Sequence, residues 1–348
     1  ERLRAVKAAL RVAEIQQKLG DSAAAGASFA RGCQMIDDLD EGSQSDRAIG
    51  PAAAHAYLQR AIFHEDRREW AAGTAAAERS IQWVERILKQ PDASPSYHYI
   101  GVDALLTLVH IQRSSGQVDL ARQSFQRAVD ALRDAPNPTE VDGQIRRLVV
   151  LNNLASEAGQ LGAGDARRNL QTSAVALAEQ LENHAAHDRD TLPNVARTYQ
   201  HYSGLFADDE NHSERLQWLE RAITVFRTVL RRAPFDPLAR HELAKMLRSR
   251  ATIAKDMKQI QQAVDRLQEA IDLLKPAVET HPDSFDIVLT HAKTLNQHGT
   301  ELTSLKRWPE ARTALDAAIK QYETLQSQSA PTHEIAVSLG GALVNRGL

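Results

Sequence analysis

The stretch SGQVDLARQSFQRAVDAL, residues 115–132, decides the fold of this protein. It reads as one amphipathic helix in which Ala121, Phe125 and Ala128 stand at i, i+4 and i+7 and therefore lie on one face. A small, a large and a small residue on one face let a second helix approach closely while the aromatic ring fills the adjoining gap. One such face arises easily by chance, so its recurrence along the chain decides what it means.

The same face recurs with a near-constant period. The first small position holds Ala25, Gly73, Ala121, Ala166, Arg215, Ala263 and Ala311, spaced by 48, 48, 45, 49, 48 and 48 residues. The large position holds Phe29, Ala77, Phe125, Leu170, Leu219, Leu267 and Leu315. The second small position holds Gly32, Ser80, Ala128, Ser173, Ala222, Ala270 and Ala318. A period held across the whole chain is the signature of a repeat protein.

These units resemble tetratricopeptide (TPR) repeats, which are helix–turn–helix units with small residues where the helices cross. The residues that carry the resemblance are SSGQVDLARQSFQRAV (114–129) and SLKRWPEARTALDAAI (304–319), with Trp70 and Trp308 at the aromatic turn position. The resemblance implies an all-α, TPR-like, right-handed superhelical solenoid of antiparallel helix pairs, a single domain over residues 1–348. We expect seven elongated repeats, approximately 1–45, 50–91, 97–136, 141–186, 192–234, 237–281 and 284–328, and a partial eighth at 332–348.

The repeats are longer than usual. A TPR unit has ~34 residues, so the ~48-residue period here predicts helices of ~20 residues, each ~30 Å long. Repeats of this length resemble the region C-terminal to the catalytic domain of bacterial receptor-type serine/threonine protein kinases. That resemblance implies a sensor or interaction region in the periplasm, belonging to a membrane-anchored kinase whose kinase domain is absent from this chain. The alternative is a cytoplasmic TPR scaffold or regulatory module attached to another effector, such as a DNA-binding domain.

The composition excludes several kinds of partner and site. The formal net charge of −3 argues against a nucleic-acid partner, since proteins that bind nucleic acids are markedly basic. Cys33 is the only cysteine, which excludes an intramolecular disulfide and a thiolate metal cluster. No apolar stretch approaches the ~18 residues of a membrane helix, so we expect no membrane contact by this segment. The sequence begins and ends within helical patterns, so we expect it to belong to a longer protein.

Proline punctuates the repeats, because it stops one helix and sets the turn into the next. Asp236 before Pro237, and Asp283 or Ser284, are expected to cap the helices that follow. Pro276 lies inside a helical pattern and should kink or end the second helix of repeat six. Repeats four and five are irregular, which indicates either ordinary drift or a bend. The punctuating prolines are Pro91, Pro136, Pro234, Pro282 and Pro331.

Candidate chemistry is sparse. The segment HAAHDRD places His184, His187, Asp188 and Asp190 where a linker is due, and we favour a solvated loop over a metal site. His298 falls at a packing position seven residues after His291, which indicates an interior histidine rather than a ligand. No nucleophile–base pair stands out. We predict no catalytic residue, no cofactor and no metal, and hence that this chain alone is not an enzyme.

The first helices of TPR arrays line a concave groove that holds extended peptides or partner helices. In repeats one to three the groove-facing set is mixed: Lys7, Glu14, Gln17, His55, Glu65, Asp66, Asp103, His110 and Arg113. In repeats five to seven it is mostly basic: Arg197, Gln200, Lys245, Arg248, Lys255, Asp256, Lys293 and Asn296. We therefore predict a protein or peptide partner that docks an acidic segment on Arg197, Gln200, Lys245, Arg248, Lys255, Lys293 and Asn296. The alternative is that these residues form only a solvated helical face.

Overall fold

The protein is all-α in the parts that the structure describes. The structure is a computed structural model, and it describes residues 2–19, 21–40, 46–90, 93–184, 191–207, 212–328 and 333–347. Those ranges hold fifteen α-helices and no β-strand, which confirms the predicted seven helix pairs and the first helix of a partial eighth repeat. The elements are α1 (Arg2–Lys18), α2 (Ser22–Asp40), α3 (Asp46–Asp66), α4 (Trp70–Leu88), α5 (Ser96–Ser114), α6 (Val118–Asp134), α7 (Val141–Gln160), α8 (Gly164–His184), α9 (Thr191–Ser203), the 3-10 helix η1 (Gly204–Phe206), α10 (His212–Arg232), α11 (Pro237–Asp256), α12 (Ile260–Thr280), α13 (Phe285–Ser304), α14 (Trp308–Gln328) and α15 (His333–Gly347).

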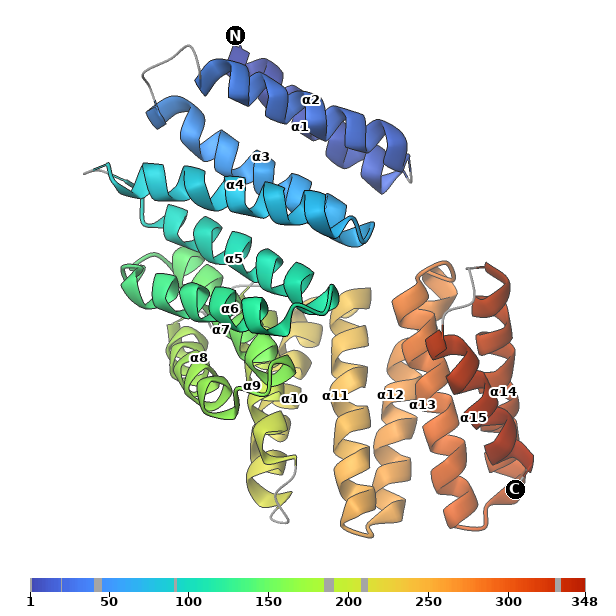
Figure 1. The fold of residues 1–348 in the computed structure, drawn as a ribbon. Coiled ribbons are helices and arrows are strands. Elements are labelled where there is room, and N and C mark those ends of the chain that lie inside the picture. The colour runs from blue at the N-terminus through green and yellow to red at the C-terminus, as the bar shows by residue number, and fades with distance from the viewer. Residues whose placement is uncertain are drawn as a thin grey trace. The chain divides into compact units, whose positions relative to one another are not determined.

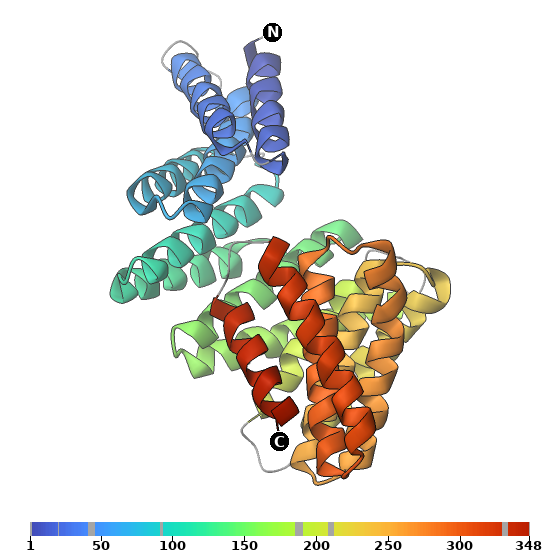
Figure 2. The ribbon, with the colours of Figure 1, turned by 90° about the vertical axis from the view of Figure 1, so that its right-hand side faces the viewer.

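The chain divides into two compact units, Glu1–Leu177 and Ala178–Leu348, hereafter unit 1 and unit 2. In unit 1, α1 packs on α2, α3 on α4 and α5 on α6, and the first helices α1, α3, α5 and α7 contact one another in order. Unit 2 repeats this arrangement with α9–α10, α11–α12 and α13–α14, and α13 contacts both α11 and α15 (Figure 1). In Figure 2, α14 and α15 stand at the red end of unit 2. Helix pairs stacked in chain order are a TPR-like solenoid, as predicted.

The repeated face is the core. Ala25, Ala121 and Ala263 are fully buried at the first small position, as are Phe125 and Leu267 at the large position, each at most 5% exposed. Apart from α9, the paired helices are 17–21 residues long, which confirms the length expected from the period. Each pair therefore buries its own face against its partner helix and the next repeat.

One turn geometry joins the two helices of a pair in five repeats. In the third repeat, Gly116 has a φ of +81° and its N–H donates to Arg113 O, while Gln117 N–H donates to Gln112 O at 2.7 Å. These two bonds are a Schellman motif, which ends a helix on one left-handed residue. The left-handed residue stands five positions before the first small residue, as in Gly116 and Ala121 (121 − 116 = 5). The five left-handed residues are Arg68, Gly116, Gly162, Lys258 and Lys306.

The same turn corrects the register predicted for repeat four. Gly162 has a φ of +71°, and five positions later stands Arg167 rather than Ala166. Ser173, assigned to the second small position, is exposed, while Ala174 beside it is fully buried. The first small slot thus holds an arginine, which fits because Gly159 leaves room for its stem: a Cβ at Gly159 would lie 3.4 Å from Arg167 Cδ.

Other local predictions have mixed outcomes. Asp236 caps α11 as expected, accepting hydrogen bonds from Leu238 N and Ala239 N at 3.0 and 3.1 Å. Ser284 occupies the N-cap position of α13, but its side chain makes no capping hydrogen bond. Of the two outcomes expected for Pro276, the end of the helix does not occur, because α12 continues through it to Thr280, and the kink stays a prediction.

Repeat five departs from the common length. α9 has 13 residues and is followed by the 3-10 helix Gly204–Phe206.

Three of the punctuating prolines follow second helices as predicted, namely Pro136, Pro234 and Pro282. The other two, Pro91 and Pro331, lie outside the described residues.

Candidate functional site

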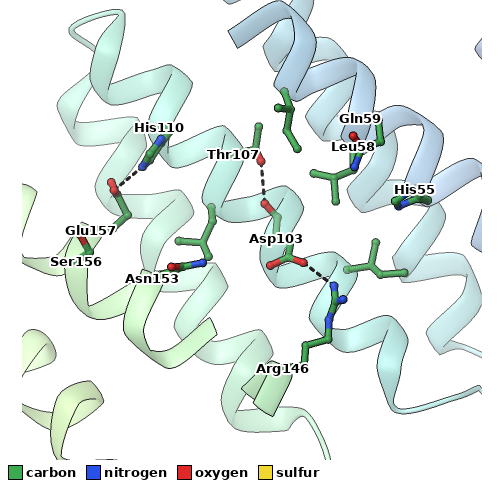
Figure 3. A pocket seen from close by; sticks show the side chains of 13 residues that line it. His55, Leu58, Gln59, Asp103, Thr107, His110, Arg146, Asn153, Ser156 and Glu157 are labelled. Carbon is green, nitrogen blue, oxygen red and sulfur yellow. Dashed lines mark hydrogen bonds and ion pairs between the residues drawn. The ribbon is translucent and has the colours of Figure 1, made fainter. Parts of the chain in front are cut away.

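A hollow on the first helices of unit 1 lies between α3, α5 and α7, and Figure 3 shows it from close by. Its volume is about 630 Å³, within the range of roughly 300–1,000 Å³ typical of ligand sites. Helix α3 contributes the side chains of one wall and α7 those of the other, with α5 between them. The lining residues are His55, Leu58, Gln59, Ile62, Ile100, Asp103, Leu106, Thr107, His110, Arg146, Asn153, Ser156 and Glu157.

His110 joins three first helices through its ring. The Nδ1–H donates to Glu65 Oε1 of α3 at 3.0 Å, and the Nε2–H donates to Glu157 Oε1 of α7 at 2.5 Å (Figure 3 shows the second). The hydrogen bonds with Glu157 and then Glu65 raise the pKa of His110 to about 9, so the ring is charged at neutral pH. Burial acts to raise the pKa of Glu157, but His110 and Arg113 together hold it below its ordinary value.

A second ion pair closes the other end of this hollow. Arg146 of α7 donates to Asp103 Oδ2 of α5 at 2.6 Å, as drawn in Figure 3. Burial raises the pKa of Asp103, and the guanidinium of Arg146 opposes that shift. Three residues predicted to face the groove, His55, Asp103 and His110, are thus brought together around one cavity. Sequence reasoning missed Arg146 and Glu157, the α7 partners of Asp103 and His110, because it assigned no groove-facing residues to repeat four.

The first helices of unit 2 carry a separate cavity of about 410 Å³. Four residues of the predicted partner-binding set line it: Arg248 and Lys255 from α11, and Lys293 and Asn296 from α13. The remaining lining residues are Gln297, Thr300, Glu301, Tyr322 and Ser338. Arg197, Gln200 and Lys245 of the same set do not line this cavity.

Most cations of the predicted basic column are already paired. Lys245 Nζ lies 3.2 Å from Glu242 Oε1, and Arg197 Nε lies 3.9 Å from Glu242 Oε2. Lys255 Nζ lies 3.2 Å from Glu301 Oε1 of the next first helix.

Lys293 follows the same pattern and pairs with Glu334 of α15. The description of this face as predominantly basic therefore needs correction, because Glu242, Glu301 and Glu334 share it. Sequence reasoning missed these three acids, although Glu242 lies three residues before Lys245 and hence on the same helix face.

Arg248 is the exception. Among the described residues no carboxylate pairs with its guanidinium, and its buried Nε has no hydrogen-bond partner there. Burial lowers the pKa of Arg248, which reflects the cost of holding an uncompensated charge away from water. Tyr322 lies beside it: burial raises the pKa of Tyr322 to about 12, and the charge of Arg248 acts in the opposite direction. This guanidinium is thus placed to receive an anion.

The histidine predictions divide. His291 and His298 are both buried, 7% and 8% exposed, and burial lowers the pKa of each. His298 is therefore an interior histidine, as predicted. His184 has no described side chain, and the rest of the HAAHDRD segment lies outside the described residues. Over the described ranges, no group of three or more His, Cys, Asp or Glu side chains is arranged to hold a metal ion. Within that same part of the chain, no helix combines the length and the apolar composition that crossing a membrane requires.

Comparisons with known proteins bear on the fold. No protein-family model matches the sequence, and no curated protein matches it. The structure is similar to BtubC (BKLC) from P. vanneervenii, with a TM-score of 0.57 and 12% identity over 74% of this chain and 92% of that chain. It is also similar to the apo form of RapI, with a TM-score of 0.51 and 9% identity over 92% of this chain and 99% of that chain. Identities this low show likeness of fold alone.

Proposed function

We propose that this chain is a non-catalytic module that binds a protein or peptide, and that it docks an acidic segment on the first helices of unit 2. The observation that carries the proposal is Arg248, a guanidinium without a carboxylate partner among the described residues, at a cavity that Lys293 and Asn296 also line. A bound carboxylate would supply the missing counter-charge without displacing an existing ion pair. The amide of Asn296 accepts a hydrogen bond from Asn345 Nδ2 at 3.1 Å and keeps its own N–H groups to donate to a peptide backbone.

The test compares a capped decapeptide of alternating alanine and glutamate with its glutamine counterpart. We expect the acidic peptide to bind the 348-residue chain more tightly, with an affinity that falls as salt is added. Arg248→Gln removes the charge without stranding a carboxylate, and we expect about tenfold weaker binding, which corresponds to roughly 1.4 kcal/mol. The matched control is Arg312→Gln on the second helix α14, where the side chain is 72% exposed. Equal binding by wild type and Arg248→Gln would refute the assignment.

We further propose that the parent protein is a membrane-anchored bacterial serine/threonine kinase, with this region as its periplasmic sensor. The support is the period of about 48 residues, which exceeds the ~34 of ordinary TPR units. The competing proposal is a cytoplasmic TPR scaffold or regulatory module attached to another effector. Reading the coding sequence upstream of residue 1 separates them: a kinase domain followed by an apolar span favours the first, and a DNA-binding or other effector domain favours the second.

A further inference from the structure

The hollow of unit 1 differs chemically from that of unit 2. Every charged side chain that lines it is already paired: His110 with Glu65 and Glu157, and Asp103 with Arg146. The Thr107 hydroxyl is also engaged, since it donates to Asp103 O at 3.0 Å. The lining therefore presents no unsatisfied charge to a ligand.

Four other polar side chains on the two walls make no side-chain hydrogen bond with the described residues. His55 and Gln59 stand on α3, and Asn153 and Ser156 stand on α7, on either side of α5 (Figure 3). An amide such as Gln59 or Asn153 offers both donors and an acceptor, the combination that pairs with a peptide bond. Hydrogen-bond donors and acceptors on both walls of a groove can bind the N–H and C=O groups of a peptide main chain that runs between the walls.

The floor between these walls is aliphatic. Leu58 and Leu106 are buried, and Ile62 and Ile100 are half-buried, so they accept an apolar side chain. A charged side chain would have to be desolvated next to Glu157, whose side chain is only 5% exposed and already holds two cations. Such a group would either break an existing pair or stay uncompensated, and both are costly.

We infer that the hollow between α3, α5 and α7 is a second binding site, selective for an uncharged extended peptide segment that places an aliphatic side chain on the floor. This site is independent of the proposed acidic-segment site, because all its lining residues lie in unit 1. Its binding should be insensitive to salt, whereas an ionic site weakens as salt is added.

The experiment uses three capped pentapeptides with a central leucine, flanked by glutamine and serine, or with one flanking residue replaced by glutamate or by lysine. Calorimetry at 50 and 500 mM salt measures affinity, and hydrogen–deuterium exchange on the full chain locates the site. We expect the uncharged peptide to bind with less than a twofold change between the two salt concentrations and to protect α3, α5 and α7. Each charged peptide should bind at least tenfold more weakly.

Asn153→Ala tests the residues themselves. Asn153 is exposed, so the variant should fold, as circular dichroism will check, and we expect its affinity for the uncharged peptide to fall at least tenfold. Gln123→Ala, an exposed amide on the second helix α6, is the matched control and should bind as wild type does. Arg248→Gln should also leave this binding unchanged.

Three results would overturn the inference. One is equal affinity in Asn153→Ala and Gln123→Ala. Another is protection of α3, α5 and α7 by the glutamate peptide but not by the uncharged one. The third is binding of an uncharged oligosaccharide, maltohexaose, at these helices without binding of the peptide.

Discussion

Gly299 of α13 packs directly against α14. A Cβ added there would lie 2.6 Å from Leu315 Cγ and 3.1 Å from the backbone oxygen of Ala311. Leu315 is 2% exposed, so its side chain has no solvent to move into, and the oxygen can move only with α14. Gly299→Ala should therefore destabilise unit 2.

The change in the free energy of unfolding expected for Gly299→Ala combines two opposing effects. Overpacking of this kind costs about 1–3 kcal/mol, while alanine in a helix interior gains up to ~1 kcal/mol over glycine. Because one of the contacted atoms belongs to the backbone, we expect a net loss of about 1–2 kcal/mol. Gly341→Ala on α15 isolates the second effect, since nothing lies within 4 Å of its added Cβ and the residue is exposed. That control should gain up to ~1 kcal/mol.

Urea unfolding followed by far-UV circular dichroism measures both changes, and hydrogen exchange over 285–328 localises them. The two glycine variants should move the free energy of unfolding in opposite directions. If Gly299→Ala gains stability as Gly341→Ala does, helices α13 and α14 are not packed as closely as the structure places them, and the reasoning fails.

Three further perturbations test other parts of the fold. Phe125→Ala, at a side chain 5% exposed, should cost about 3–5 kcal/mol, with hydrogen-exchange protection lost mainly around α6; uniform loss along the chain would contradict nearest-neighbour coupling. Lys306→Gly should raise the urea midpoint, because a φ of +60° costs a lysine ~1–2 kcal/mol that a glycine avoids. The greater conformational entropy that glycine loses on folding offsets part of this gain. An unchanged or lower midpoint would refute this. The bonds to Glu157 and Glu65 raise the folded-state pKa of His110 to about 9, above the ordinary 6.5 expected when unfolded. Their stabilisation is therefore complete below pH 6.5 and lost as pH rises through about 9, and His110→Asn, followed by pH-dependent melting, should remove that part of the profile.

The apolar framework was predictable because it repeats. Alanine, phenylalanine and leucine at fixed offsets are sufficient to define the helix faces, and the paired helices follow from them. The single-residue slip at Arg167 was not predictable from that pattern, since the sequence offers the small residue Ala166 one position earlier. Only the turn at Gly162 reveals which of the two fills the slot.

The left-handed turns were only partly predictable from the sequence. Gly116 and Gly162 are the residues that a left-handed turn favours, but Lys258 and Lys306 adopt the same conformation and carry no such sequence signal. At Lys258 and Lys306, the packing of the two helices of the repeat overrides the preference of lysine for other backbone conformations.

The polar face was the least predictable part. The basic residues of repeats five to seven are on first helices as expected, yet whether a lysine is free depends on the neighbouring repeat. Glu301, which pairs with Lys255, is 1% exposed, and nothing in the local sequence marks it as that partner. Long-range pairing of this kind sets which charges remain available to a ligand, and among the described residues it leaves Arg248 without a carboxylate partner.

The hydrogen bonds and ion pairs between successive first helices have a consequence for how the chain assembles. The apolar faces are nearly interchangeable, so a helix pair that skipped its neighbour while folding would still bury a similar surface. The polar contacts are not interchangeable: the ring of His241 reaches Thr290 at 2.8 Å, and Lys255 reaches Glu301. A skipped repeat would leave His241 and Glu301 buried without their partners, at a cost of roughly 1–3 kcal/mol for each such group. The order of α11 and α13 is thus encoded in polar pairs specific to their junction, which disfavour misassembled stacks that the apolar pattern alone would permit.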